Sequence, residues 1–438
     1  MTAGGREAAL TALTACRKLD AWSDGSLKAA SRDLDRREAA LAAQLTYGVL
    51  QNRALLDFYL GGYCSQPFEK LEPFVRDVLR LGAYQILFLD RVPDSAAVDQ
   101  AVEMVKGSRK RAAGLVNAVL RRLSREKANL PEIPAKDPAQ YLSLRYSHPR
   151  WLVERLLEIL GGEEAEAFLR LDNEGVPTTI QRNPLACTRE ELLRSLEESG
   201  AAAAPHRWMP DCWEMSGGGD LEALPAFQKG LFLVQDAAAR AAVLAAGPKP
   251  GEEVLDVCAA PGGKSFAAAM EMAGQGRITA CDIHPHKLAL IEKGARRLGL
   301  TCVQTVQADG RENRAEWNGA FDLVLCDVPC SGLGIIRKKP DIRYKDPKAL
   351  AGLPRVQRAI LENASRYVKS GGTLVYATCT IVPEENEDVT ADFLSRYGQF
   401  RKEPFSLPGL EGETDGSLTL WPQRHGTDGF YVCKMRKL

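Results

Sequence analysis

The chain has 438 residues, of which 57 are basic and 57 acidic, and an apolar content of 45%. Such a length exceeds one ordinary hydrophobic core and predicts two or three domains. No apolar stretch is long enough to cross a bilayer, and the first residues lack the basic and apolar segments of a secretory signal. These features argue against a membrane protein, and we expect a cytoplasmic protein with no membrane partner.

Eleven cysteines are many for a cytoplasmic chain, but their placement argues against disulfides and against a metal site. Several lie in or at the ends of apolar, strand-like runs: Cys258, Cys281, Cys326 and Cys379. The sequence has no CxxC pair, and its five histidines do not lie near cysteines at the spacing of zinc ligands. We therefore expect reduced thiols, one or two of them reactive, and no bound metal.

The net charge of zero conceals two basic clusters. Residues 106–127 carry eight lysines or arginines and a single acid, Glu126. The second cluster comprises Arg337, Lys338, Lys339, Arg343 and Lys345. Local positive patches bind phosphates whatever the total charge. Each cluster is explained equally well as a solvated face, so neither alone indicates a nucleic acid.

The first part of the chain has helical periodicity up to about residue 124, and we assign a compact all-helical domain to residues 1–128. A proline-containing linker follows at 127–137. Residues 140–245 mix both kinds of pattern, with a strand-like run at 178–182, and predict a small α/β subdomain.

From residue 246 onward, strand-like runs alternate with helical segments. The runs lie at 254–258, 278–282, 303–308, 321–327 and 373–378, and the helical segments at 264–272, 285–298, 350–368 and 384–397. This alternation predicts a parallel sheet with helices on both faces, which binds ligands at the carboxyl ends of its strands. We therefore assign an α/β domain to residues 246–438.

The first of these strands leads into the sequence DVCAAPGGK, residues 256–264. Its glycines allow a close approach of the backbone to a ligand, and neither a Walker spacing nor a GxGxxG is present. Asp282 and Asp309 follow the next two strands, where a carboxylate can accept ribose hydroxyls or meet the adenine side of a ligand. Each aspartate alone could simply cap a helix. Together the three strand ends favour a nucleoside-containing cofactor.

Two thiols follow neighbouring strands at the same predicted edge. Cys330 lies in the turn DVPC after the fourth strand, beside Asp327, and Cys379 follows Thr378 at the end of the fifth. Buried cysteines are usually inert. Two cysteines at adjacent strand ends next to an aspartate nevertheless favour a reactive pair.

These motifs, together with PDIR at 340–343 and PEEN at 383–386, resemble the RsmB/NOP family of RNA cytosine-5 methyltransferases. The likeness runs from about residue 141 to the C-terminus, and the family's Asp-Ala-Pro-Cys is DVPC here. The N-terminal part resembles the NusB-like RNA-binding domain. The resemblance implies an α/β Rossmann-like core that uses S-adenosyl-L-methionine, an all-α NusB-like domain, a small α/β subdomain between them, and a final antiparallel strand pair that includes 430–435.

The combination of domains implies a partner and a substrate. It implies that a monomer acts on 16S ribosomal RNA, free or early in assembly, and not on DNA. We expect residues 337–345 to meet RNA phosphates near the site, and the helical domain to supply a second RNA contact.

The resemblance also implies roles for individual residues. Cys379 is the nucleophile, Cys330 assists release, Asp327 contacts the base, and Lys264 lies near the cofactor and the base. The implied cofactor-binding residues are Cys258, Ala259, Ala260, Pro261, Gly262, Gly263, Lys264, Asp282, Asp309 and Asp327. A thiolate that adds to carbon 6 of cytosine prepares carbon 5 to accept a methyl group. Chemistry alone permits the reverse assignment of the thiols, since DNA cytosine-5 methyltransferases use the Pro-Cys thiol.

Other functions remain open at this point. A methyltransferase of transfer RNA or DNA would share the chemistry. A non-enzymatic RNA-binding factor of the antitermination type would rest on the helical domain alone, and would leave the two thiols unexplained. An NAD-dependent oxidoreductase is disfavoured because the glycine fingerprint is missing.

Overall fold

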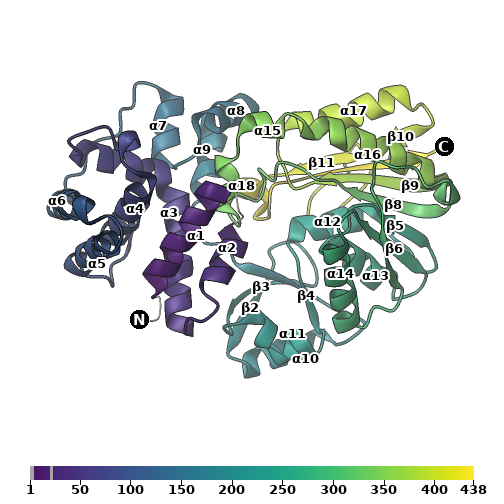
Figure 1. Cartoon of the computed structure of the whole chain (residues 1–438). Helices are drawn as coiled ribbons and strands as arrows, with labels where there is room; N and C mark the ends of the chain where they lie inside the picture. The colour runs from purple at the N-terminus through teal and green to yellow at the C-terminus, as the bar shows by residue number, and fades with distance from the viewer. Residues whose placement is uncertain (1–3, 20–22) are drawn as a thin grey trace. The chain divides into compact units, whose positions relative to one another are not determined.

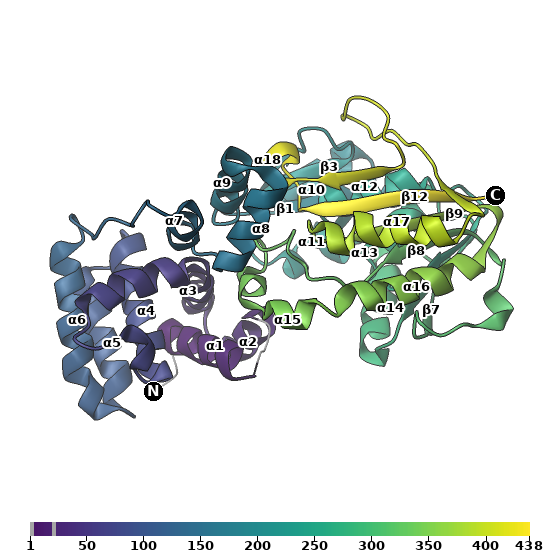
Figure 2. The ribbon, with the colours of Figure 1, turned by 90° about the horizontal axis from the view of Figure 1, so that it is seen from above.

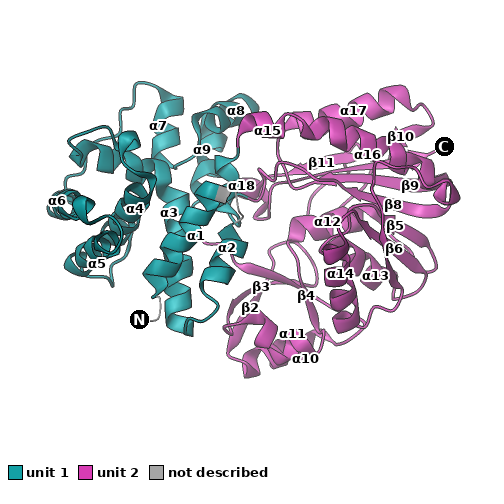
Figure 3. Ribbon diagram, viewed as in Figure 1, with its two compact units in different colours: residues 1–174, 336–345 teal, residues 175–335, 346–438 magenta. Residues whose placement is uncertain are grey.

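A computed structural model of the chain describes residues 4–19 and 23–438. The chain forms two compact units (Figure 3). Unit 1 comprises Met1–Glu174 and Ile336–Lys345, and unit 2 comprises Gly175–Ile335 and Asp346–Leu438. A ten-residue segment from the second half of the sequence therefore belongs to unit 1. Within the described ranges, no helix is both long and apolar enough to span a membrane.

Unit 1 consists of helices, which confirms the helical prediction for the N-terminal part (Figure 1). Asp35 begins the longest of them by accepting hydrogen bonds from the backbone N–H groups of Arg37 and Glu38. Leu45, Leu79 and Leu120 lie fully buried in the shared core. The α-helices are α1 (Gly5–Leu19), α2 (Ser23–Ala30), α3 (Arg36–Tyr63), α4 (Pro73–Phe88), α5 (Asp94–Lys106), α6 (Ala113–Glu126), α7 (Pro138–Arg145), α8 (Arg150–Leu160) and α9 (Gly162–Leu171). The short 3₁₀ helices are η1 (Phe68–Lys70), η2 (Lys110–Ala112) and η5 (Pro340–Tyr344).

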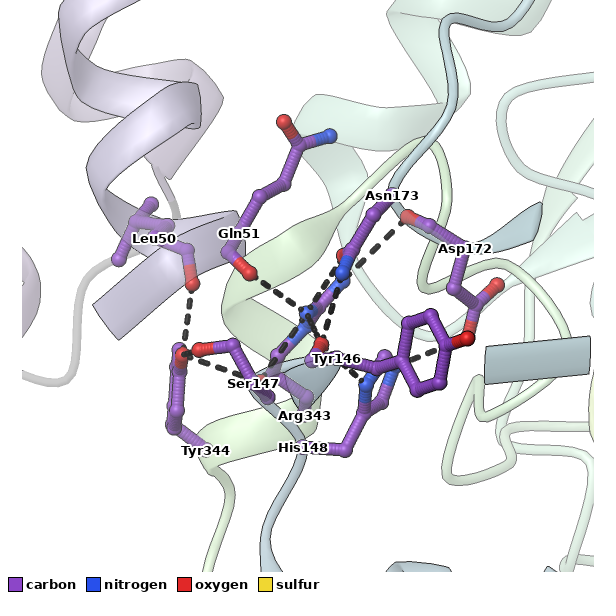
Figure 4. A network of polar contacts seen from close by, with 9 residues as sticks. All are labelled: Leu50, Gln51, Tyr146, Ser147, His148, Asp172, Asn173, Arg343 and Tyr344. Carbon is purple, nitrogen blue, oxygen red and sulfur yellow. Dashed lines mark hydrogen bonds and ion pairs between the residues drawn. The ribbon is translucent and has the colours of Figure 1, made fainter. Parts of the chain in front are cut away.

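The segment Ile336–Lys345 is held in unit 1 by Arg343, whose side chain is fully buried. Its Nη1 donates to the carbonyl oxygens of Gln51 and Ser147, both at 3.1 Å, and to Asn173 Oδ1 at 2.9 Å (Figure 4). The expectation that the second basic cluster meets RNA phosphates is therefore wrong for Arg343. Its guanidinium is already enclosed by protein acceptors.

The middle of α3 is one of the parts of unit 1 that this segment contacts. Tyr344 Oη donates to the carbonyl oxygen of Leu50 at 2.6 Å, next to the Gln51 carbonyl that Arg343 binds (Figure 4). One turn later, the backbone N–H of Ala54 donates to Ser147 Oγ at 2.7 Å. Backbone groups in the interior of a helix thus bond to side chains from two other segments of the chain. The stability of α3 depends on both.

Arg343→Met tests this dependence. The variant keeps a long apolar stem but removes every donor of the guanidinium, so the buried acceptors around it lose a partner. We expect the free energy of unfolding of unit 1 to fall by about 3 kcal/mol or more, because hydrogen bonds to a charged group contribute about 1.5–3 kcal/mol each. Hydrogen exchange of the α3 amides near Ala54 measures this loss. Arg125→Met, at an exposed site in the same unit, is the control, and equal exchange in the two variants would contradict the account.

Unit 2 begins with a four-stranded antiparallel sheet in the order β2-β3-β1-β4. Its elements are β1 (Thr178–Arg182), α10 (Arg189–Glu198), β2 (Ala201–Pro205), β3 (Cys212–Gly217), η3 (Leu221–Ala223), α11 (Pro225–Gln228) and β4 (Phe232–Val234). The strand predicted at 178–182 is confirmed. Buried Ile180, Leu192 and Phe232 form the core between this sheet and its helices.

The larger sheet of unit 2 has the order β10-β12-β9-β8-β5-β6-β7, with β11 paired to β12. Strands β7, β6, β5, β8 and β9 are parallel, and β12 runs antiparallel to β9. Both the parallel sheet and the final antiparallel strands were predicted and are confirmed. The elements are α12 (Ala237–Ala246), β5 (Glu253–Asp256), α13 (Gly263–Glu271), β6 (Arg277–Asp282), α14 (Pro285–Leu298), β7 (Val303–Gln307), η4 (Ala315–Trp317), β8 (Phe321–Asp327), α15 (Pro347–Leu350), α16 (Leu353–Tyr367), β9 (Val368–Thr378), η6 (Pro383–Glu385), α17 (Glu387–Arg396), β10 (Phe400–Lys402), β11 (Ser417–Leu420), α18 (Pro422–His425) and β12 (Phe430–Lys437).

Helices cover both faces of this sheet (Figures 1 and 2). Successive strand residues point to opposite faces, so Val254 packs in the apolar layer with α12, α13 and α14. Its neighbour Leu255 packs in the other layer, with Ile360 of α16 and Phe393 of α17. Because both layers are apolar, the strands read as continuous hydrophobic runs, and the polar residues that follow them gather at the carboxyl edge.

Candidate active site

The loop between β5 and α13 opens the site at the carboxyl edge of the large sheet. Asp256 ends β5 and is fully buried, with Ser265 Oγ donating to its Oδ2 at 2.7 Å. Burial raises the pKa of Asp256 to about 6. Its Oδ1 has no hydrogen-bond partner among the described residues. Gly262 has φ of +113°, a conformation that a side chain would strain, and precedes the first turn of α13.

Two further carboxylates follow the neighbouring parallel strands. Asp282 ends β6, is buried, and accepts a hydrogen bond from the His284 N–H at 2.9 Å. Asp309 follows β7 and is paired with the Arg311 guanidinium, which lowers the pKa of its carboxyl group. These acceptors, together with the unpartnered oxygen of Asp256, suit the hydroxyl and amino groups of a nucleoside. The residues at this edge therefore fit the adenosine part of S-adenosylmethionine.

The thiols of Cys330 and Cys379 meet at the adjoining part of the same edge. Cys330 follows β8 and Cys379 follows β9, and their sulfur atoms lie 3.3 Å apart, in hydrogen-bonding contact. The register pairs Asp327 with Ala377, so the parallel strands end side by side and bring both turns to one place. All eleven cysteines are free thiols. Each of these two is partly accessible, as a reactive thiol must be.

The two thiols differ in their surroundings. The contact with Cys379 raises the pKa of Cys330 well above its usual value, with further contributions from burial and from the charges of Glu385 and Asp327. Cys330 therefore holds its proton. Burial likewise raises the pKa of Cys258 and of Cys326, so these thiols stay protonated and unreactive.

Lys264 provides the positive charge beside the thiols. Its Nζ lies 2.5 Å from Asp327 Oδ2 and 4.9 Å from the centre of the Phe430 ring. Burial opposes the charge on Lys264, but the Asp327 carboxylate outweighs that effect, and the pKa of Lys264 is raised. Cys379 acts on it in the same direction. Lys264 is thus a cation that faces both an aspartate and the Cys379 sulfur.

The sequence motifs did not identify the polar residues beneath the two thiols. Glu385 and Asn386 are buried and bond to the turns that carry Cys330 and Cys379. Both residues belong to the motif PEEN, which was noted in the sequence, but the motif alone did not indicate what either residue does. Gln357, a fully buried amide on α16, had no sequence signal at all.

Three family descriptions match successive parts of the chain. Residues 242–436 match "16S rRNA methyltransferase RsmB/F". Residues 4–125 match "NusB family". Residues 148–222 match "Methyltr_RsmF/B-like, ferredoxin-like domain". These matches agree with the predicted fold class, a Rossmann-like methyltransferase core with a NusB-like N-terminal domain.

Full-length relatives are similar along almost the whole chain. The "Probable ribosomal RNA small subunit methyltransferase B" of Bacillus subtilis is 37% identical over 443 residues, which cover 99% of this chain and 98% of the relative. The protein of the same description from Synechocystis is 34% identical, with 99% of both chains covered. A crystal structure of a methyltransferase homologue from Pyrococcus horikoshii is 28% identical, has a TM-score of 0.58, and covers 68% of this chain and 98% of its own.

Asp282→Ala tests the assignment of the nucleoside site. Loss of the carboxylate removes a charged acceptor for ribose hydroxyls, so affinity for S-adenosylmethionine should fall by about tenfold or more, because such hydrogen bonds contribute about 1.5–3 kcal/mol. Isothermal titration calorimetry of the full chain measures the affinity. Asp388→Ala, at an exposed position on α17, is the matched control. Unchanged affinity in Asp282→Ala would remove Asp282 from the site.

Proposed function

The chain belongs to the RsmB/F family of 16S rRNA methyltransferases, and from that premise we propose that it methylates carbon 5 of one cytosine in 16S ribosomal RNA. S-adenosylmethionine is the methyl donor of this family. The observation that carries the proposal is the contact of 3.3 Å between the thiols of Cys330 and Cys379, next to a loop that suits a nucleoside. In cytosine C5 methylation one thiol can attack carbon 6 while the other assists release of the product, so the reaction has a use for both.

We propose that Cys379 begins the reaction as a thiolate. It adds to carbon 6 of the cytosine and forms a sulfur–carbon bond. The electron pair of the C5=C6 double bond moves onto carbon 5. When bound, S-adenosylmethionine supplies an electrophilic methyl group, whose bonding pair stays on the cofactor sulfur. The adduct held by Cys379 takes this methyl group at carbon 5. Cys330 remains protonated during the attack, in keeping with its raised pKa.

Cys330 then completes the reaction. The largest cause of its raised pKa is the contact with Cys379, and that cause weakens once the Cys379 sulfur is bound to carbon 6. Cys330 can now give its proton to solvent and, as a thiolate, remove the proton from carbon 5. The released pair re-forms the C5=C6 bond and expels Cys379 as a thiolate. One proton is lost overall, and the two thiols return to their starting state, with Cys379 as a thiolate and Cys330 protonated.

Asp327 and Lys264 lie next to the thiols, and we propose a role for each. We propose that Asp327 contacts the cytosine near N3, where charge develops when carbon 6 is attacked. Lys264, 2.5 Å away, holds that carboxylate in place and stabilises negative charge on Cys379. The cofactor itself is assigned to residues 258–264, Asp282 and Asp309, beside Asp327.

The substrate assignment rests on the relatives, which are described as ribosomal RNA small subunit methyltransferases. Transfer RNA is the second candidate, because the same thiol chemistry serves any accessible cytosine. The base must leave its stack to reach Cys379, which favours free or early-assembled RNA over a finished particle. A ribosomal RNA substrate implies an enzyme of the cytoplasm. We propose that this enzyme acts as a monomer and that DNA is not a partner.

Transfer of a labelled methyl group to unmodified 16S ribosomal RNA tests the reaction. The wild-type chain should methylate a single cytosine, which bisulfite sequencing locates. Cys379→Ala should abolish transfer, since the nucleophile is gone. Cys330→Ala should still form the adduct but release it slowly, so a protein–RNA complex that survives denaturing electrophoresis should accumulate.

Three results would contradict the proposal in different ways. Transfer to transfer RNA but not to 16S ribosomal RNA would keep the chemistry and discard the substrate. Full transfer by Cys379→Ala would discard the mechanism. Lack of both transfer and cofactor binding in the wild type would favour a non-enzymatic RNA-binding protein.

We also propose that exposed arginines on α6 contact RNA phosphates. Arg121, Arg122 and Arg125 are exposed on one helix of the part that matches the NusB family. Replacing all three by Gln should weaken RNA binding and lower the slope of log affinity against log salt by about two to three, because each lost phosphate contact removes about 0.7–0.9 from it. Filter binding at several salt concentrations measures the slope. Arg194→Gln, at an exposed position on α10, is the control, and an unchanged slope in the triple variant would rule out this contact.

A further inference from the structure

A buried polar network lies beneath the two thiols and bonds to both turns that carry them. The Glu385 carboxylate accepts the backbone N–H of Ser331 at 2.9 Å and the Gln357 Nε2–H at 2.7 Å. Gln357 Nε2 also donates to the carbonyl oxygen of Pro329 at 3.0 Å. The residues directly before and after Cys330 are therefore held by the Glu385–Gln357 pair.

Asn386 holds the Cys379 turn in the same way. Its Oδ1 accepts the hydroxyl of Thr378 at 2.6 Å, and its Nδ2 donates to the carbonyl oxygen of Thr380 at 3.1 Å. The residues directly before and after Cys379 are thus both bonded to one amide. Glu385 and Asn386 are consecutive, so the two turns share a single two-residue support.

A third contact links the turns directly. Ser331 Oγ lies 2.7 Å from Thr380 Oγ1, one residue after each thiol. Ser331, Thr380, Glu385, Asn386 and Gln357 are all at most 3% exposed. Water cannot readily replace these hydrogen bonds, so losing one leaves a buried polar group without a partner. The separation of the two sulfur atoms therefore depends on this network.

We propose that Glu385 and Asn386 are positioning residues that hold the two thiols in contact, and that the Glu385 charge keeps the shared proton on Cys330. The surroundings of Cys330 support the second part: the charges of Glu385 and Asp327 add to the contact with Cys379 and raise the pKa of Cys330. Cys330 therefore holds its proton before RNA arrives. The catalytic consequence rests on the proposed function, but the protonation of Cys330 does not.

Among the described residues, five other ionisable groups lie around the two thiols. They are Asp327, Lys264, Cys258, Cys326 and Tyr376. Burial raises the pKa of Cys258, Cys326 and Tyr376, so these three stay neutral through the pH range of thiol alkylation. The charged groups that raise the pKa of Cys330 are thus Glu385 and Asp327.

Thiol alkylation of the full chain tests the protonation of Cys330 without RNA or cofactor. Iodoacetamide is applied over a series of pH values, and peptide mass spectrometry follows each cysteine. In the wild type, Cys330 should react only at a pH above the usual range of a thiol, because the thiolate is the reactive form and the pKa of Cys330 is raised. Glu385→Gln keeps the side-chain shape but removes the charge, so the Cys330 profile should move to lower pH. Glu384→Gln, at the exposed neighbouring position, should leave both profiles unchanged.

Steady-state kinetics test the positioning. Glu385→Asp keeps the charge but has a shorter reach, so it should lower kcat by about 10- to 100-fold with little change in KM, since a misplacement of about 1 Å costs about 100-fold. It should leave the alkylation profile of Cys330 close to that of the wild type. This variant also keeps the test decisive if Glu385→Gln fails to fold.

The outcomes separate this inference from the proposed function. Wild-type alkylation profiles in Glu385→Gln, or wild-type kcat in Glu385→Asp, would overturn it even if the enzyme methylates RNA. An inactive wild type would refute the proposed function, and the alkylation profiles would still decide whether Glu385 sets the proton position.

Discussion

The contact between the thiols of Cys330 and Cys379 is the constraint on which the catalytic account depends. One sulfur must attack while the other keeps its proton, and later the second must act as a base. A separation of 3.3 Å makes each thiol sensitive to the charge of the other. In the proposed mechanism, the state of Cys379 therefore controls when Cys330 ionises, and the order of the two steps follows from their contact.

The sheet supplies that contact through register and topology. Strands β8 and β9 are parallel neighbours, so the turns that follow them leave the same edge of the sheet. Strands β5, β6 and β7 bring to that edge the carboxylates that we propose for the nucleoside site. Apolar layers on both faces fix the strands. Polar chemistry is confined to their ends, where Glu385 and Asn386 tie the two cysteine turns together.

Much of this arrangement could be predicted because its signals are local. The buried runs, the Asp282 strand end and the turn with Cys330 are each visible in a few consecutive residues. The place of Arg343 in unit 1 could not be predicted, since its acceptors, such as Gln51 and Asn173, lie far away in the sequence. Gln357 was missed for a different reason: one buried amide on an amphipathic helix leaves no periodic signal. The division of the chain into domains of residues 1–128, 140–245 and 246–438 remains a proposal.

The most direct test of the central claim identifies the thiol that bonds to the base. RNA containing 5-fluorocytosine traps the adduct, because carbon 5 then carries fluorine in place of the proton that must leave. Proteolysis of the trapped complex and mass spectrometry reveal the modified peptide. We expect the nucleotide on Cys379, with Cys330 unmodified. A nucleotide on Cys330 would contradict this assignment and reverse the roles of the two thiols.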